Sequence, residues 1–259
     1  KGTRMKSRTP KVLHRLGGRP LIQHVMETAQ ALRARRTIVI TGHGADELET
    51  WLRAAASAAG WTAPDCVRQE PQLGTGHAVQ QVVPVLPDDG IALILNGDVP
   101  LIRAETLQAL VERCGGERLA LLTMEMADPA GYGRIVREGD AVRAIVEHKD
   151  ASPAQRAIRE VYTGFMAVPS ARLKGWLARL TNDNAQGEYY LTDVVRLAVA
   201  DGCEVVASPA AEQVEVDGVN SPVQLAGLGR AFQRRQAPAL MEQGVRLADP
   251  ARFDLRGTL

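Results

Sequence analysis

Residues Ile91 to Ile102 read Ile-Ala-Leu-Ile-Leu-Asn-Gly-Asp-Val-Pro-Leu-Ile, and this stretch decides the fold. Its first five residues are apolar and lack the alternation of a half-exposed strand, so they predict a strand buried on both faces, as in a parallel sheet. The Asn-Gly-Asp turn cluster ends that strand, and Pro100 prevents it from continuing. Because α/β sheets bind ligands beyond the carboxyl ends of their strands, Asp98 is well sited to hold a hard cation such as Mg²⁺ on a substrate phosphate. An equally supported interpretation is that Asp98 only shapes the turn or caps the next helix.

The composition is that of an ordinary globular protein and excludes several classes of function. Of the 259 residues, 45% are hydrophobic and 24% are charged, with a net charge of +1. An aromatic content of 4% and the absence of a basic block argue against a nucleic-acid partner. No apolar run is long enough for a membrane span and no signal peptide is visible, so we expect a cytoplasmic protein with no membrane partner. The three cysteines are far apart and form no metal-binding pair or disulfide framework.

Strand-like and helix-like segments alternate along the rest of the chain. We expect strands at residues 36–41, 91–95, 119–126, 135–137, 141–147, 160–168, 204–207 and 213–216, and helices at 45–59, 103–114 and about 221–243. Helices of this length between strands indicate βαβ units and a mostly parallel sheet.

Two glycine-containing segments are candidates for ligand contacts. Near the amino terminus, Lys-Gly-Thr-Arg-Met places a glycine among basic residues, and Pro10-Lys11 follows. The backbone N–H groups and cations of such a loop suit phosphates, although a solvated basic terminus is the commoner meaning of this pattern. The segment Gln69 to Ala78 contains Gly-Thr-Gly directly before a predicted helix, where exposed N–H groups can meet carbonyls or anions. It is not a P-loop, because the Gly-Lys-Ser/Thr ending is absent. Since the first residue is Lys1 rather than Met, we expect the natural chain to begin earlier.

The chain contains several short motifs in a specific order. They are Gly-Thr-Arg-Met with Pro-Lys-Val-Leu, Gln-Leu-Gly-Thr-Gly-His-Ala, Asn-Gly-Asp-Val-Pro-Leu, Gly-Tyr-Gly-Arg-Ile, Ile-Val-Glu-His-Lys-Asp, Asn-Asp-Asn-Ala-Gln-Gly-Glu-Tyr-Tyr-Leu-Thr-Asp and Val-Asp-Gly-Val-Asn. The ordered set covers nearly the whole chain. It resembles the pyrophosphorylase domain of the bacterial bifunctional N-acetylglucosamine-1-phosphate uridyltransferase/glucosamine-1-phosphate acetyltransferase.

The resemblance implies a Rossmann-like nucleotidyltransferase (GT-A-like) α/β fold, with a mostly parallel mixed sheet and helices on both faces. It places a pyrophosphorylase domain at residues 1–222, without its extreme N-terminus and the family's Leu-x-x-Gly segment. A linker helix would follow at 223–243, and residues 244–259 would begin a left-handed β-helix acetyltransferase domain. In the family that second domain builds a homotrimer, so we expect the full-length protein to be a trimer and this chain to be monomeric and without acetyltransferase activity.

The resemblance also implies a reaction and a set of site residues. The phosphate of N-acetylglucosamine 1-phosphate would attack the α-phosphorus of UTP with Mg²⁺ as cofactor, giving pyrophosphate and UDP-N-acetylglucosamine for peptidoglycan and lipopolysaccharide precursors. Such a transfer needs charge neutralisation and alignment rather than a general base. The matching positions are Arg4 and Lys11 for catalysis and phosphate binding, Asp98 and Asn220 for the metal, Gln69, Gly74 and Thr75 for the uracil, Gly133, Glu147 and Tyr162 for the amino sugar, and Asn96 as a further substrate contact.

One departure and two alternatives accompany this hypothesis. Tyr162 stands where the family usually has an asparagine that touches the sugar. Either the sugar choice has changed, or the ring turns aside and a backbone group makes the contact. A related transferase for glucose 1-phosphate is one alternative, and a nucleotide-sugar sensor without catalysis is the other.

Overall fold

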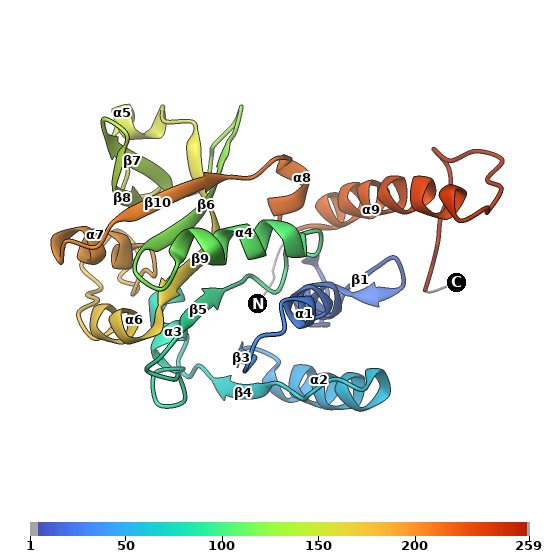
Figure 1. The fold of residues 1–259 in the computed structure, drawn as a ribbon, viewed down its shortest axis with the longest axis horizontal. Helices are drawn as coiled ribbons and strands as arrows, with labels where there is room; N and C mark the ends of the chain where they lie inside the picture. Colours follow the sequence, from blue (N-terminus) through green and yellow to red (C-terminus); the bar gives the residue numbers. More distant parts are fainter. Residues whose placement is uncertain (1–4, 258–259) are drawn as a thin grey trace. The chain divides into compact units, whose positions relative to one another are not determined.

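The computed structural model describes residues 5–257 of the chain (Figure 1). The chain divides into two compact units. The terminal unit combines the described residues up to Arg33, the segment Asn96–Ala104, and the described residues from Glu212 onward. The sheet unit contains Ala34–Leu95 and Glu105–Ala211. Among the described residues, no helix combines the length and apolar character that crossing a membrane would require.

The structure assigns the following elements along the chain. The strands are β1 (Arg15–Leu16), β2 (Arg19–Pro20), β3 (Ile38–Thr41), β4 (Asp65–Arg68), β5 (Ile91–Ile94), β6 (Leu119–Glu125), β7 (Arg134–Glu138), β8 (Ala141–Val146), β9 (Glu160–Pro169) and β10 (Val205–Pro209). The helices are α1 (Leu21–Ala31), α2 (Ala45–Ala59), α3 (Thr75–Gln80), α4 (Ala104–Cys114), α5 (Pro153–Arg156), α6 (Ser170–Leu177), α7 (Asp193–Ala200), α8 (Gln213–Val216) and α9 (Pro222–Glu242), and η2 (Lys11–Leu13) is a short 3₁₀ turn.

The main sheet belongs to the sheet unit and is mixed, as expected, but parallel pairs do not predominate in it. Its order is β10-β6-β9-β7-β8, and β5 also pairs with β9 (Figure 1). Among the described residues of this sheet, β10 and β6 form the one parallel pair, whereas β9 is antiparallel to β5, β6 and β7. The expectation of a mostly parallel sheet is therefore wrong. The long strand β9 runs against its neighbours, and hydrophobic patterns carry no information on strand direction.

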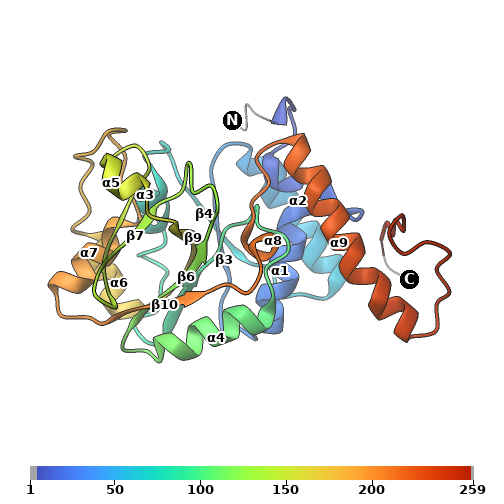
Figure 2. The same ribbon diagram turned by 90° about the horizontal axis from the view of Figure 1, so that it is seen from above.

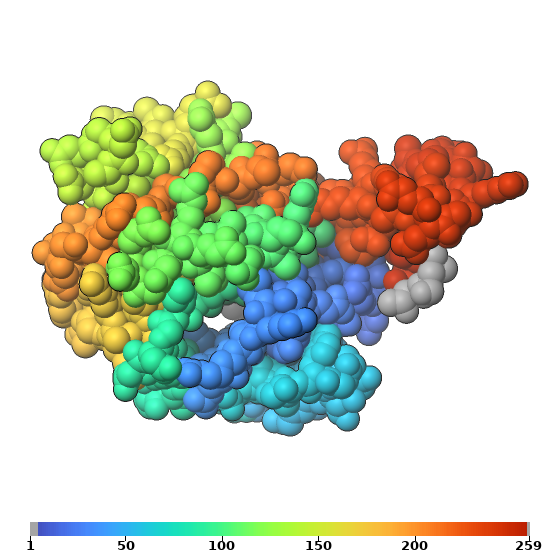
Figure 3. All heavy atoms as spheres, in the orientation of Figure 1, coloured from blue at the N-terminus to red at the C-terminus, as the bar shows by residue number. Residues whose placement is uncertain are grey.

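The strand that ends before Asn96 forms as predicted, but its burial differs from the prediction. All four residues of β5 are half-buried rather than fully buried. The chain then turns at Asn96 and enters α4 at Ala104, close to the predicted start. Helix α4 buries Leu107, Leu110 and Cys114 at helical spacing and leaves its opposite face open to solvent (Figure 3).

The remaining core of the sheet unit joins strands and helices that are distant in sequence. Strands β3 and β4 form a separate parallel pair connected by α2, which is a βαβ arrangement. Beneath the main sheet, Met166 and Val168 of β9 pack in one cluster with Leu173 and Trp176 of α6 and Val194 of α7. Burial of these side chains supplies the main driving force for folding of this unit.

The terminal unit is organised around α1 and α9 (Figure 2). Strands β1 and β2 form a hairpin across Gly17 and Gly18, whose φ angles of 57° and 84° suit glycine in a two-residue turn. Leu21 of α1 packs in one apolar cluster with Leu228 and Phe232 of α9. Helix α9 begins as predicted, because the Ser221 hydroxyl accepts a hydrogen bond from the Gln224 N–H and proline follows it.

The expected strand at residues 213–216 is wrong, since these residues form helix α8. The four-residue pattern is too short to separate a strand from one helical turn. Tertiary contacts decide the outcome. The Glu215 carboxylate is fully buried and accepts a hydrogen bond from the Arg103 N–H at 3.2 Å. A turn of helix delivers this side chain to the chain segment that follows Asp98.

Candidate functional site

In the terminal unit, three of the predicted residues meet although they are far apart in sequence. The Lys11 ammonium group donates to Asp98 Oδ2 in an ion pair and to Asn220 Oδ1 at 3.0 Å. The side chains of Lys11 and Asp98 keep 29% and 19% of their surface exposed. A carboxylate oxygen and an amide oxygen therefore converge on one positive charge that solvent and solutes can reach.

Backbone contacts hold the two oxygen-bearing loops together. The Val219 N–H donates to the Asp98 carbonyl at 2.9 Å, which joins the loop after β5 to the loop before α9. Gly218 precedes Val219 in the loop before α9, and a β-carbon there would sit 3.7 Å from Asp98 Oδ2. Asn220 is fixed in turn, because its N–H donates to Gln224 Oε1 at 2.8 Å. The position of the two oxygens is thus set by the backbone rather than by side-chain packing alone.

The oxygen pair fits a hard divalent cation. Magnesium is usually held by one or two protein carboxylates or carbonyl oxygens, with substrate phosphates and water completing the shell. Among residues 5–257, no group of three or more His, Cys, Asp or Glu side chains is arranged to hold a metal. A site with Asp98 and Asn220 as its only protein ligands agrees with that chemistry, and Lys11 occupies the cationic position between them in this structure.

In the sheet unit, Gln69, Gly74 and Thr75 are the residues expected to bind the uracil. Gln69 follows β4, and its side-chain amide donates to the Gly74 carbonyl at 2.9 Å. Thr75 begins α3, and its hydroxyl oxygen accepts from the Leu191 N–H at 3.1 Å. The Gly76 N–H donates to the Tyr189 carbonyl at 2.7 Å, so the Gly-Thr-Gly turn is bonded to the segment that precedes α7.

The close approach of that segment explains the glycine at position 74. Gly74 has φ 110° and ψ 173°, a conformation essentially restricted to glycine. A β-carbon there would lie 2.6 Å from the Tyr189 carbonyl oxygen and 2.9 Å from the Tyr189 nitrogen. The Tyr189 N–H donates to the Leu73 carbonyl at 2.8 Å, which keeps the two backbones in contact.

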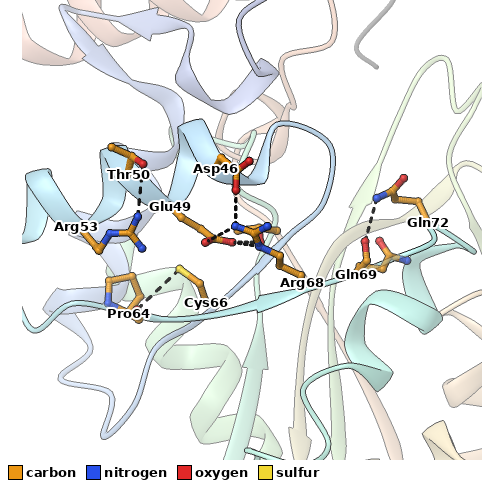
Figure 4. Close-up of polar contacts among 10 residues, drawn as sticks. Asp46, Glu49, Thr50, Arg53, Pro64, Cys66, Arg68, Gln69 and Gln72 are labelled. Carbon is orange, nitrogen blue, oxygen red and sulfur yellow. Dashed lines mark hydrogen bonds and ion pairs between the residues drawn. The ribbon is translucent and has the colours of Figure 1, made fainter.

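A half-exposed ion pair supports β4, the strand that ends immediately before Gln69 (Figure 4). Arg68 donates to both oxygens of Glu49 at 2.9 Å, and the Thr41 hydroxyl donates to Glu49 Oε1 at 2.8 Å. These hydrogen bonds, with Arg68 contributing most, lower the pKa of Glu49 to about 2. The Gln69 N–H donates to the Thr41 carbonyl at 2.8 Å, so the network fixes the backbone on which Gln69 stands.

The three residues predicted to contact the sugar belong to the same unit. A β-carbon on Gly133 would sit 3.6 Å from Glu147 Oε1, and the Gly133 carbonyl accepts from the Tyr162 N–H at 2.9 Å. Burial raises the pKa of Glu147, while a hydrogen bond from the Thr192 hydroxyl at 2.9 Å opposes that shift. The Tyr162 ring belongs to the apolar core, and burial raises the pKa of its hydroxyl, which has no hydrogen-bond partner among the described residues.

Three further residues hold these groups, and pattern reasoning assigned none of them a role. Thr192 donates to Glu147, His77 contacts the amide of Gln69, and Arg134 is almost completely buried beside Gly133. Arg134 donates to the Tyr132 carbonyl and, at 3.2 Å, to His148 Nδ1, so it ties the chain before Gly133 to the chain after Glu147. All three residues stand inside the ordered motifs, but their contacts depend on the fold.

Arg4 and Asn96 complete the set of predicted residues. Arg4 lies outside the described residues. The Asn96 carbonyl accepts from the Val99 N–H at 3.3 Å and so closes the turn that presents Asp98. Within the part of the chain that the structure describes, the Asn96 side chain makes no hydrogen bond to the other predicted residues.

The chain is similar to proteins of known activity. Residues 1–164 match the family model described as MobA-like NTP transferase domain. The bifunctional protein GlmU of Polaromonas naphthalenivorans is 65% identical, over 100% of this chain and 56% of its own length. The GlmU of Paracidovorax citrulli is 67% identical, over 99% of this chain and 54% of its own. The chain therefore spans about half the length of the curated relatives it matches, and the resemblance seen in the ordered motifs is confirmed.

A solved structure agrees with the fold. A UDP-glucose pyrophosphorylase in complex with UDP-glucose superposes with a TM-score of 0.71, covering 90% of this chain and 95% of that one. Its sequence identity of 17% means that this likeness supports the fold alone. The α/β nucleotidyltransferase fold with a mixed sheet is confirmed.

Proposed function

Because the chain belongs to the family of MobA-like NTP transferase domains, we propose that it transfers a uridylyl group from UTP to N-acetylglucosamine 1-phosphate. The products are UDP-N-acetylglucosamine, a precursor for peptidoglycan and lipopolysaccharide, and pyrophosphate. The observation that carries the proposal is the convergence of Lys11, Asp98 and Asn220, since a phosphate-transfer site needs a cation and its ligands together. The similarity to the GlmU proteins supports the choice of substrates.

The reaction forms one bond and breaks one. A phosphate oxygen of the sugar phosphate attacks the α-phosphorus of UTP, and the bond from that phosphorus to the β-phosphate oxygen breaks. Pyrophosphate leaves with the electron pair. The attacking phosphate is already an anion, so a protein general base is unnecessary, and catalysis consists of alignment and charge neutralisation.

The residues of the terminal unit supply the neutralisation. Asp98 and Asn220 would hold Mg²⁺, which when bound stabilises negative charge on the transferring phosphates. Lys11 is then freed from these two oxygens, and its ammonium group binds a phosphate of UTP. Arg4 contributes a second cation at the same reaction step.

The residues of the sheet unit supply recognition. Gln69, Gly74 and Thr75 bind the uracil, and Gly133 and Glu147 bind the hydroxyl groups of the sugar. Glu147 Oε1 accepts from Thr192, whereas Oε2 accepts no hydrogen bond from the described residues and is available to a sugar hydroxyl. Tyr162 contributes its backbone next to Gly133 while its ring stays in the core. The pyrophosphorylase domain occupies residues 1–222, with α9 as the linker helix and residues 244–259 as the start of a β-helix domain. Within the full-length protein that domain builds a trimer.

A pyrophosphate-release assay tests the proposal. The protein is supplied with UTP, dTTP or GTP and with N-acetylglucosamine 1-phosphate or glucose 1-phosphate, in Mg²⁺ and in EDTA. We expect release with UTP and the N-acetylated sugar, and its loss in EDTA. Binding of UDP-N-acetylglucosamine without any pyrophosphate release would favour a sensor. A preference for glucose 1-phosphate would overturn the sugar assignment and keep the uridylyl transfer.

A further inference from the structure

Gln69 is held at nearly all of its polar atoms. Its backbone carbonyl accepts from Gln72 Nε2 at 2.9 Å, and its backbone N–H donates to the Thr41 carbonyl at 2.8 Å. Its side-chain nitrogen donates to the Gly74 carbonyl at 2.9 Å and lies 3.2 Å from Nδ1 of His77. The side-chain oxygen Oε1 is the remaining group, and it accepts no hydrogen bond from residues 5–257. Gln69 thus presents one acceptor and withholds both of its side-chain donors.

The neighbours of the amide determine this orientation. A carbonyl oxygen can only accept, so the end of the amide beside the Gly74 carbonyl must be the NH₂ group. The second N–H then points to His77 Nδ1, which accepts only when its proton is on Nε2. A ring protonated on Nδ1 would set two N–H groups against each other and favour release or reversal of the amide. The tautomer of His77 is therefore coupled to the orientation of Gln69.

Gln81 contacts the same ring from the other side. Its side-chain nitrogen lies 3.1 Å from His77 Nε2 and 3.0 Å from the His77 carbonyl. A neutral imidazole has one acceptor nitrogen, so the ring cannot accept from both glutamines. Gln81 keeps the carbonyl as an acceptor, whereas Gln69 is buried with the Gly74 carbonyl beside it. His77 Nδ1 is consequently the acceptor for the Gln69 amide.

We propose that His77 is a positioning residue for the choice of nucleobase: it locks the amide of Gln69 so that only Oε1 faces the base. The inference rests on the proposed uridylyl transfer, in which Gln69 binds the base. Uracil carries an N–H at ring position 3, which donates to such an acceptor. Cytosine carries an unprotonated nitrogen there, whose lone pair would face the lone pairs of Oε1. A freely rotating glutamine would accommodate both bases, and the locked one favours uracil.

Three substitutions separate this role from general packing. His77→Phe removes the acceptor and keeps an aromatic ring near Tyr189, whose ring centroid lies 6.2 Å from that of His77. His77→Asn retains an acceptor, because Oδ1 of asparagine branches from the same carbon as Nδ1 of histidine. Gln81→Leu is the matched control, since the Gln81 amide lies beside the ring and makes no hydrogen bond to Gln69. The readout is kcat/KM for UTP and for CTP with N-acetylglucosamine 1-phosphate.

We expect His77→Phe to lower the ratio of kcat/KM for UTP over CTP by about fivefold to tenfold, the effect of one neutral hydrogen bond. The KM for the sugar phosphate should stay unchanged. His77→Asn should restore most of the ratio, and Gln81→Leu should leave it as in the wild type. An unaltered ratio in His77→Phe, or an equal loss for both nucleotides, would overturn the proposal.

A measurement on the unaltered protein keeps the test independent of folding in the variants. Long-range ¹H–¹⁵N NMR correlations of the imidazole report which nitrogen of His77 carries the proton. We expect the proton on Nε2, and a proton on Nδ1 would contradict the locked amide. A wild-type protein that releases no pyrophosphate from UTP would instead refute the proposed function, and the tautomer result would still stand on its own.

Discussion

Replacing Gly74 by alanine is expected to destabilise the sheet unit by about 3 kcal/mol. The conformation at φ 110° and ψ 173° costs a non-glycine residue about 1–3 kcal/mol. The added β-carbon would lie 2.6 Å from the Tyr189 carbonyl oxygen, so the two backbones must separate. That movement weakens the bonds from Gly76 to Tyr189 and from Tyr189 to Leu73, each worth about 1 kcal/mol. The net destabilisation stays below the sum of these contributions, because the backbone around Gly74 relaxes in part.

The matched control is Gly175→Ala. Gly175 lies inside α6, and a β-carbon there meets no atom within 4 Å. Alanine at an unobstructed helical position stabilises by about 0.5–1 kcal/mol, so the two substitutions should change stability in opposite directions.

Urea denaturation followed by tryptophan fluorescence measures both effects. All three tryptophans, Trp51, Trp61 and Trp176, belong to the sheet unit, so the signal reports the unit that carries Gly74. The KM for UTP should rise in Gly74→Ala, because the segment that binds the base has moved. A free energy of unfolding within about 0.5 kcal/mol of the wild type, with an unchanged KM, would refute the close approach as the reason for this glycine.

Three further outcomes are expected. Asp98→Ala should reduce Mg²⁺-dependent turnover on the order of a thousandfold, with unchanged thermal unfolding because the residue lies beyond β5; near-normal turnover would remove Asp98 from the metal site. Tyr162→Phe deletes a buried hydroxyl without a partner among the described residues, so calorimetry should show unchanged or up to about 1 kcal/mol higher stability, and a clear loss would contradict that environment. The Arg68 and Thr41 contacts lower the pKa of Glu49 from 4.5 to about 2, so their stabilisation is present above pH 4.5 and is lost as the pH falls toward 2. Glu49→Gln should therefore flatten the decline of the melting temperature between these pH values, and an unchanged decline would exclude the ion pair as its cause.

The sequence was sufficient to predict features that depend on local chemistry. The strand before Asn96, the turn bearing Asp98 and the helix after it all formed near the expected positions. The start of α9 followed from a capping hydroxyl and a proline, both of which act within one helical turn. The predicted hairpin of β7 and β8 formed around Gly139, whose φ is 57°. In each case the residues that determine the feature are neighbours in the sequence.

Features that depend on contacts between distant segments could not be predicted. The direction of β9 against its neighbours and the helical turn at α8 are settled by tertiary packing. The meeting of Lys11 with Asp98 and Asn220 was predicted only through the resemblance, because spacing says nothing about residues so far apart. The contact between His77 and Gln69 was not predicted at all, since it requires knowing that the Gln69 side chain reaches the Gly74 carbonyl at the start of α3.

The segment from Tyr189 to Thr192 connects the proposed base and sugar contacts within the sheet unit. Tyr189 bonds the Gly-Thr-Gly turn, and the Leu191 N–H donates to the Thr75 hydroxyl. The next residue, Thr192, donates to Glu147. A displacement of the base-binding turn is therefore transmitted through at most four residues to the carboxylate assigned to the sugar. In the proposed reaction, binding of UTP would thus set the position of Glu147 for the acceptor sugar, and a substitution confined to the turn would raise the KM of both substrates.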